Sequence, residues 1–133
     1  MNGVAAIVGL AVLEYMIFGL LVGRARGTYH IPAPATTGDP TFERYFRVHQ
    51  NSMEALIVFI PSLLLFAYYV SASLAIAVGL IFLVGRVIYG TGYITAPEKR
   101  GPGAMITFAV NATLVLGAII GPIVHHFRVH QGF

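Results

Sequence analysis

The sequence contains no cysteine, which excludes disulfide bonds, thiolate metal sites and a protein thiol nucleophile. Charge is also scarce, because only 10% of the 133 residues are charged while 57% are hydrophobic, and the mean hydropathy is +0.80. A typical soluble domain has about 25% charged residues. The shortage of charge therefore predicts an integral membrane protein.

Four apolar segments have the length of roughly 20 residues that a helix needs to cross a bilayer. They lie at about residues 4–22, 45–70, 74–93 and 104–124. No Lys or Arg precedes the first segment and it carries Glu14, so we expect a membrane helix there and not a signal peptide. Four spans leave no room for a soluble domain. The sequence thus predicts one domain over residues 1–133, an all-α up-down bundle of four transmembrane helices.

The basic residues are distributed unevenly along the chain. Six of the eight lie in or beside the first and third connections (residues 23–44 and 94–103), whereas Arg128 lies on the opposite side. The positive-inside rule therefore predicts that both connections face the cytosol, in the cell inner membrane or an endomembrane. Because the basic residues do not cluster on a soluble face, no nucleic-acid partner is expected. The histidines near the end of the chain are expected to form a solvated tail, with no metal site.

A polar stripe enters the second span. Arg47, Gln50, Asn51 and Glu54 are spaced i, i+3, i+4 and i+7, so they share one face of a helix. Fifteen largely apolar residues follow them. Charge inside a membrane is costly and by default marks a functional site.

A second stripe ends the third span. Arg86, Tyr89 and Tyr93 are spaced i, i+3 and i+7, and Arg100 follows seven residues later. Arg100 would share their face only if the helix continued past an intervening proline. Because the second and third spans run antiparallel, Glu54 and Arg86 are each about 12 Å from the cytosolic end. We therefore expect the two stripes to meet at one depth.

The polar residues of the spans have two interpretations. A Glu54–Arg86 pair, together with Glu14 and Asn111, could simply hold the helices together, as polar side chains do in membrane bundles. For Glu14 and Asn111 we expect this structural role. For the two stripes we expect a pocket, because packing needs only one or two hydrogen bonds and here four arginines converge, with Arg26 among them.

The predicted pocket has a distinct chemistry. Guanidinium groups bind carboxylates in bidentate fashion, and a lone deep carboxylate suits an ammonium group. Tyrosine hydroxyls can donate to a thiolate or an oxyanion. A ligand with two carboxylates and one amino group, entering from the cytosol, fits this set.

At these residues the chain resembles the superfamily of membrane-associated proteins in eicosanoid and glutathione metabolism. That superfamily includes microsomal glutathione transferases, the leukotriene-forming glutathione transferase and a glutathione-dependent prostaglandin E synthase. The motifs that carry the resemblance are Phe42-Glu43-Arg44, the run from Arg47 to Glu54, and Arg86-x-x-Tyr89-x-x-x-Tyr93 with Arg100 seven residues later.

The resemblance implies a homotrimer that binds glutathione between neighbouring subunits. It implies that Arg100 activates the thiol and that the glutathione contacts are Arg26, Arg47, Gln50, Asn51, Glu54, Arg86, Tyr89 and Tyr93. The chain departs from the leukotriene-forming branch at Ala55, where that branch has an aromatic residue. Other features resemble the prostaglandin synthase, so the resemblance does not identify the substrate.

The function expected from these features is conjugation of glutathione to lipophilic electrophiles dissolved in membrane lipid, with hydroperoxide reduction or isomerisation as further activities of the superfamily. One alternative is a non-catalytic lipid- or glutathione-binding protein, against which the retained Arg100 argues. Another is a small channel or transporter, which would require a continuous water path and no thiol chemistry.

Overall fold

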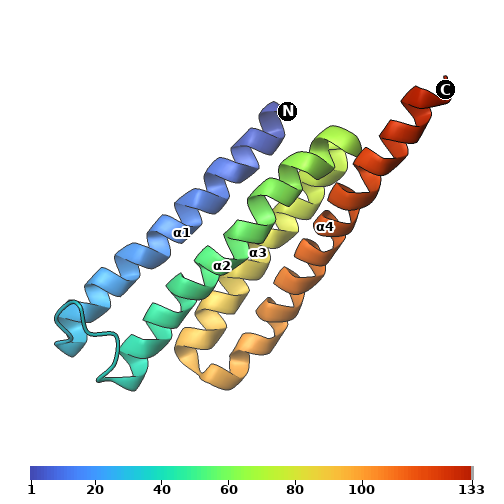
Figure 1. Ribbon diagram of the computed structural model, residues 1–133. Coiled ribbons are helices and arrows are strands. Elements are labelled where there is room, and N and C mark those ends of the chain that lie inside the picture. Colours follow the sequence, from blue (N-terminus) through green and yellow to red (C-terminus); the bar gives the residue numbers. More distant parts are fainter. Residues whose placement is uncertain (133) are drawn as a thin grey trace.

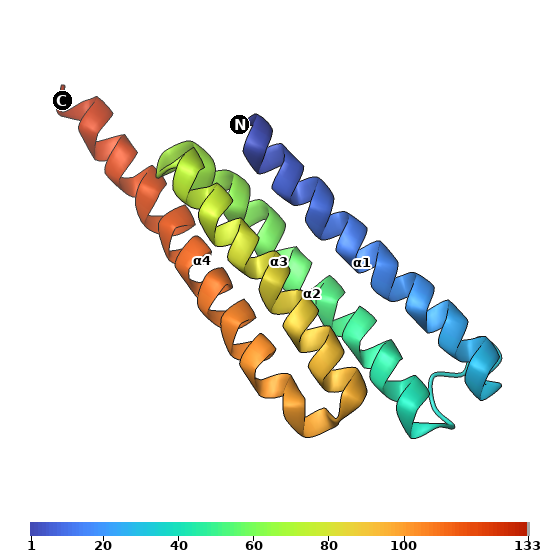
Figure 2. The same ribbon diagram turned by 180° about the vertical axis from the view of Figure 1, so that it is seen from behind.

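The computed structural model describes residues 1–132 and contains four long helices joined by short connections (Figure 1). The elements are α1 (Asn2–Tyr29), α2 (Pro40–Tyr69), α3 (Ala72–Thr95), the short 3-10 helix η1 (Pro97–Arg100) and α4 (Gly101–His130). Successive helices run in opposite directions, so both termini lie at one end of the bundle, and the α1–α2 connection and η1 lie at the other (Figures 1 and 2). We call the latter the η1 end.

All four long helices are long and apolar enough to cross a membrane. This confirms the predicted all-α bundle of four transmembrane helices. The α1 and α4 helices lie on opposite sides of the pair formed by α2 and α3, and each packs against both members of that pair (Figure 2). The α2 and α3 helices therefore carry most of the buried surface.

The helices extend beyond the predicted spans at the η1 end, so the first connection is shorter than the predicted residues 23–44. The α1 helix continues to Tyr29 and ends where His30 adopts a left-handed conformation, with φ 56°. The α2 helix begins at Pro40, where the Asp39 carboxylate accepts hydrogen bonds of 2.9 Å from two backbone N–H groups of the first turn. Such a cap is typical of a helix start. As a result, Arg24, Arg26 and Arg44 lie on helices and not in a loop.

The third connection is also more compact than predicted. The α3 helix ends at Thr95, and η1 folds back against it. Two glycines permit this close approach. A Cβ on Gly92 would lie 2.5 Å from the carbonyl oxygen of Lys99, and one on Gly103 would lie 2.3 Å from the backbone nitrogen of Tyr89. Helix α4 therefore starts in direct contact with the backbone of α3.

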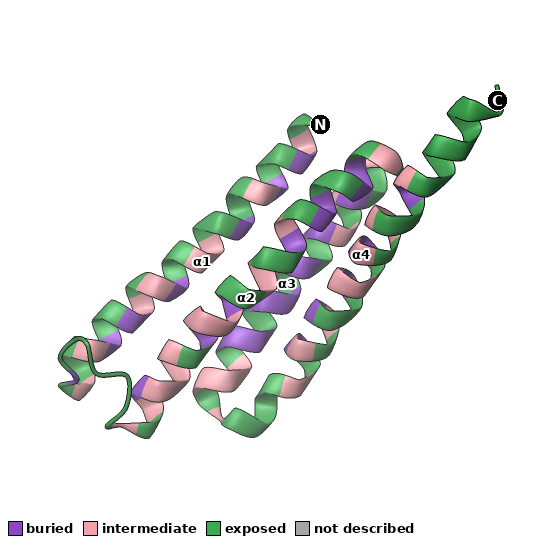
Figure 3. Cartoon of the chain, viewed as in Figure 1, coloured by how far each residue is buried: buried purple, intermediate pink, exposed green. Residues whose placement is uncertain are grey.

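The apolar core fills the half of the bundle near the termini. Its centre is a stacked pair of rings, Phe59 and Phe82, with centroids 3.7 Å apart. Many large apolar side chains point outward from all four helices, including Leu20, Ile57 and Phe108, and exposed surface follows the outer faces (Figure 3). A membrane supplies the apolar surroundings that such a surface needs. The half near η1 contains the polar stripes.

Candidate functional site

A polar pocket of about 410 Å³ lies at the η1 end, between α2 and the end of α3. We call it the polar pocket. Its lining residues are Arg47, Gln50, Asn51, Glu54, Tyr89, Tyr93 and Arg100. The structure thus brings together the two stripes that the sequence places on separate helices, and seven of the nine predicted site residues line this one pocket.

Two stacked tyrosine rings lie between two arginines along the α3 side of the site. The guanidinium carbon of Arg86 lies 4.3 Å from the centroid of the Tyr89 ring, which in turn stacks on Tyr93 with centroids 5.8 Å apart. The guanidinium carbon of Arg100 lies 5.7 Å from the Tyr93 ring. These distances are within the range of cation–π attraction. Arg100 lies near Tyr93 because η1 folds back against α3. The sequence spacing suggested instead that the α3 helix continues as far as Arg100, and this is wrong because α3 ends at Thr95.

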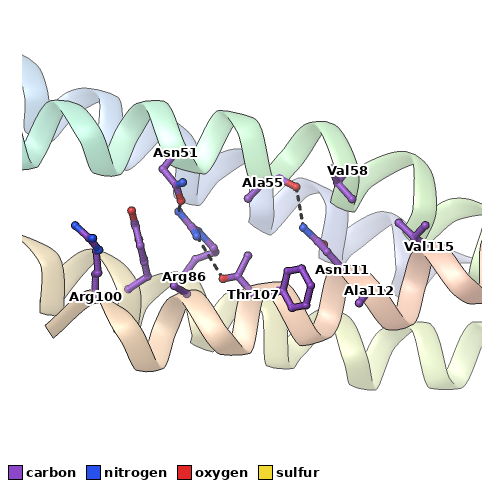
Figure 4. A pocket seen from close by; sticks show the side chains of 12 residues that line it. Asn51, Ala55, Val58, Arg86, Arg100, Thr107, Asn111, Ala112 and Val115 are labelled. Carbon is purple, nitrogen blue, oxygen red and sulfur yellow. Dashed lines mark hydrogen bonds between the residues drawn. The ribbon is translucent and has the colours of Figure 1, made fainter. Parts of the chain in front are cut away.

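Arg86 is buried, with 2% of its surface exposed, and connects three helices. Its Nη2 donates to Asn51 Oδ1 at 3.0 Å and its Nη1 donates to Thr107 Oγ1 at 3.3 Å (Figure 4). Its Nη2 also donates to Ser52 Oγ at 2.8 Å. Arg86 does not line the polar pocket, but it donates a hydrogen bond to Asn51, which does.

The expected Glu54–Arg86 pair is not formed, because Glu54 is exposed at the polar pocket, whereas Arg86 is buried. The reason is rotation. A helix turns about 100° per residue, so Glu54 points roughly 200° away from Ser52, which faces Arg86. The hydroxyls of Ser52 and Thr107 take the place of the carboxylate.

Sequence reasoning missed both of these hydroxyl residues. Each also donates to the carbonyl four residues earlier on its own helix, at 2.7 Å for Ser52 and 2.9 Å for Thr107. Serine and threonine commonly make this local bond in membrane helices. They are also uncharged, so in the sequence they do not mark a site as a charged residue inside a span does. The only sequence signal was that Ser52 adjoins the polar stripe.

Arg26 lies apart from the other predicted site residues. Its Nη1 donates to the carbonyl oxygens of Ala35 at 2.7 Å and Ile31 at 3.3 Å, and its guanidinium carbon lies 5.0 Å from the Phe42 ring. Within one chain, Arg26 therefore stabilises the α1–α2 connection. Arg26 does not converge with the other arginines in this structure, contrary to the prediction.

Two further polar residues of the first and second spans lie outside the polar pocket. Glu14 lies among apolar side chains of α1 and α3, in a separate pocket that faces away from α2. His49 stacks on Tyr15 with ring centroids 4.4 Å apart, and Gly19 leaves room for its imidazole. The packing of α1 against α2 therefore accounts for the position of the His49 imidazole, and no ligand is needed to explain it.

An apolar groove of about 550 Å³ adjoins the polar pocket, between α2 and α4 (Figure 4). Val58, Phe108 and Val115 are among the apolar side chains that line it. The residues common to the lining of both cavities are Asn51, Tyr89 and Arg100. A cation therefore stands where a polar compartment meets an apolar one.

Asn111 lines the same groove and bridges two helices. Its Nδ2 donates to the carbonyl oxygen of Ala55 at 3.3 Å, while its Oδ1 is buried without a partner. An interhelical hydrogen bond in a membrane contributes about 0.6 kcal/mol on average. A buried polar atom left unpaired costs about 1–3 kcal/mol. The structural role expected for Asn111 therefore explains the hydrogen bond of its Nδ2 but not the unpaired Oδ1.

Comparisons of the sequence with known proteins identify the family. The family model described as the MAPEG family matches residues 4–120. The chain is 37% identical to microsomal glutathione S-transferase 2 of Homo sapiens over 117 residues, which are 88% of this chain and 80% of that protein. It is 32% identical to leukotriene C4 synthase of Rattus norvegicus over 121 residues, 91% and 81% of the two chains.

A bacterial relative is more similar in sequence. An uncharacterized protein of Synechocystis is 41% identical over 116 residues, which are 87% of this chain and 85% of that protein. The family match includes most of each of the four helices, and the resemblance to the superfamily is confirmed. The chain belongs to the MAPEG family.

Proposed function

We propose that this protein is a membrane-bound glutathione transferase, which activates the thiol of glutathione and conjugates it to lipophilic electrophiles. The observation that carries the proposal is the position of Arg100 on the border between the polar pocket and the apolar groove. The names of the two mammalian relatives, a glutathione transferase and a leukotriene synthase, support the same class of activity.

Glutathione carries two carboxylates, one ammonium group and one thiol, and the polar pocket of one chain offers groups that suit one carboxylate, the ammonium group and the thiol. Arg47 supplies a guanidinium for a carboxylate, Glu54 supplies a carboxylate for the ammonium group, and Gln50 and Asn51 can bond the peptide amides. With these groups engaged, the sulfur would lie beside Arg100. Charge complementarity thus fixes the direction in which the peptide binds.

In this mechanism the Arg100 guanidinium stabilises the thiolate of bound glutathione, and the thiol proton passes to water at the η1 end. The thiolate sulfur attacks the electrophilic carbon of a substrate held in the apolar groove. A sulfur–carbon bond forms, and the leaving group, such as a halide, departs with the electrons of the broken bond. Holding both reactants on opposite sides of Arg100 supplies the proximity that accelerates the reaction.

The variant Glu54→Gln tests the binding mode. We expect it to weaken glutathione binding at least tenfold, about 1.4 kcal/mol, because the ammonium group loses its only carboxylate partner in the polar pocket. Calorimetric titration of the purified protein measures the affinity, and release of halide from an aryl halide measures conjugation. Formation of glutathione disulfide in the presence of a lipid hydroperoxide, which is reduced to the alcohol and water while two glutathione molecules are oxidised, tests whether the thiolate also reduces that class of substrate.

Glu98→Gln is the matched control, because Glu98 is an exposed carboxylate on η1 outside the polar pocket. It should retain wild-type affinity. Equal affinity of wild type and a folded Glu54→Gln variant would remove Glu54 from the site. Failure of the wild type to consume glutathione with any aryl halide would overturn the proposed function itself.

We propose further that the protein assembles as a homotrimer with the η1 end facing the cytosol. Arg47 and Glu54 line the polar pocket but are exposed in a single chain, and charge facing lipid is costly, so a second protein surface is needed to cover them. A neighbouring subunit would also bring an Arg26 to the polar pocket. The detergent-corrected mass should equal three chains of 14.3 kDa. A monomer that binds glutathione with full affinity would contradict both the trimer and a shared site.

A further inference from the structure

We propose that Asn111 recognises a hydroxyl group on the chain of the lipophilic substrate. The inference rests on the proposed function and narrows it, because it assigns a chemical class to the occupant of the apolar groove. That class is an electrophile whose hydrocarbon chain carries a hydroxyl at a distance from the reacting carbon.

The starting observation is a pair of unpartnered polar atoms. Among the buried side-chain nitrogen and oxygen atoms of residues 1–132, only Arg86 Nε and Asn111 Oδ1 lack a hydrogen-bond partner. Both residues line the apolar groove (Figure 4). Buried polar atoms are almost always paired in folded proteins, so an unpaired one calls for an explanation such as a bound ligand or water.

The identity of the unpaired atom follows from its neighbour. A backbone carbonyl only accepts hydrogen bonds, so the amide atom that lies 3.3 Å from the Ala55 oxygen is the nitrogen of Asn111. The unpaired atom is then an acceptor, Oδ1. The 3.3 Å bond is long, and the terminal torsion of asparagine is soft. The amide can therefore turn Oδ1 toward a ligand in the groove.

The surroundings select a neutral donor. Phe108, Ala112 and Val115 line the groove around Asn111, and burying an ammonium group among them would be costly. A hydroxyl donates one hydrogen bond to Oδ1 and adds no charge. Asn111 lies eleven residues, or about 16 Å, beyond Arg100 along α4. A hydroxyl bound there belongs to the chain of the substrate and not to its reacting end.

The test uses a series of aryl or enone electrophiles with a long alkyl chain. One member has an unsubstituted chain, and each of the others carries a single hydroxyl at a different position. We expect wild-type protein to prefer one hydroxyl position over the unsubstituted parent by about fivefold in kcat/KM, the order that one neutral hydrogen bond provides. In Asn111→Leu this ratio should fall to about one.

Thr113→Val is the matched control, because Thr113 lies on the same helix, is exposed, and bonds only the carbonyl of Ala109 at 2.8 Å. It should keep the wild-type ratio. If Asn111→Leu does not fold, Asn111→Ser provides the comparison, since its shorter side chain cannot reach a ligand in the same place.

Two results would overturn the inference. One is a wild-type protein that shows no preferred hydroxyl position, which requires no variant to measure. The other is a preference for the hydroxylated electrophile that stays unchanged in the Asn111 variants, because Oδ1 would then not bind the hydroxyl of the substrate. Both results are compatible with efficient conjugation of the unsubstituted parent. By contrast, absence of any conjugation would overturn the proposed function, and this inference with it.

Discussion

Replacing Arg100 with alanine is expected to lower turnover on the order of 100-fold while glutathione stays bound, the usual cost of removing one preorganised stabiliser of developing negative charge. Six other residues still line the polar pocket in this variant, so the peptide retains most of its contacts. The loss should appear in kcat more than in glutathione affinity. Single-turnover conjugation together with calorimetry separates the two quantities.

The pH dependence of Arg100→Ala gives a second readout. A guanidinium beside the sulfur favours the thiolate and lowers the pKa of the thiol, so its removal should raise that pKa toward about 8.5, the ordinary value. At neutral pH only a few per cent of the thiol would then be ionised. The activity of the variant should rise with pH through that value. Absorbance of the bound thiolate in the near ultraviolet measures the pKa directly.

Two other cations provide the comparison for Arg100. Lys99 is its exposed neighbour on η1, outside the polar pocket, so Lys99→Ala removes the same charge at the same end and should leave the thiol pKa unchanged. Arg47 is the rival activating residue, since it lines the same pocket. An unchanged thiol pKa in Arg100→Ala, with a raised one in Arg47→Ala, would transfer the activating role to Arg47.

Replacing Arg86 with methionine is expected to weaken glutathione binding at least tenfold, about 1.4 kcal/mol, and yet to leave the protein as stable as the wild type or more so. All hydrogen bonds of this buried guanidinium go to neutral side chains. A buried charge without a carboxylate bonded to it is costly, and an apolar replacement of similar length often removes that cost. Thermal unfolding monitored with calorimetric binding tests both statements.

The stability expected for Arg86→Met follows from the hydrogen bonds that the partners of Arg86 keep in the variant. Ser52 and Thr107 retain their bonds to backbone carbonyls. Asn51 loses a hydrogen bond and Tyr89 loses its cation–π contact, but both residues line the polar pocket, where water can reach them. The loss of affinity would come from Asn51 turning away from the peptide. A variant that unfolds would instead assign Arg86 a purely structural role.

Arg44 offers a control with the opposite signature. Its Nη1 donates to the carbonyl oxygens of Ile94 and Thr95, at 3.0 and 3.1 Å, where α3 ends. A cation that bonds the last carbonyls of a helix stabilises that end. We expect Arg44→Met to lower the unfolding temperature and to leave glutathione affinity unchanged. Together, Arg44→Met and Arg86→Met distinguish an arginine that stabilises the fold from one that supports ligand binding.

Local patterns in the sequence were sufficient for the bundle and for its two polar stripes. Each helix was recognisable from about 20 apolar residues, because only helices and closed barrels satisfy backbone hydrogen bonds inside a bilayer. The stripes were recognisable because the period of 3.6 residues places Arg47 and Asn51, or Arg86 and Tyr89, on one face wherever a helix forms. Both properties belong to a single helix and need no knowledge of its neighbours.

Contacts between helices required the tertiary structure. The period of a helix does not say how far it is rotated against its partner, so the sequence suggested Glu54 for Arg86, where Ser52 and Thr107 stand instead. Nor did it say that η1 folds back to bring Arg100 to Tyr93. Rotation and approach are set by packing, such as the contact of Gly103 with the backbone of Tyr89. That packing also opens the apolar groove beside the polar pocket, which no periodicity along one helix could reveal.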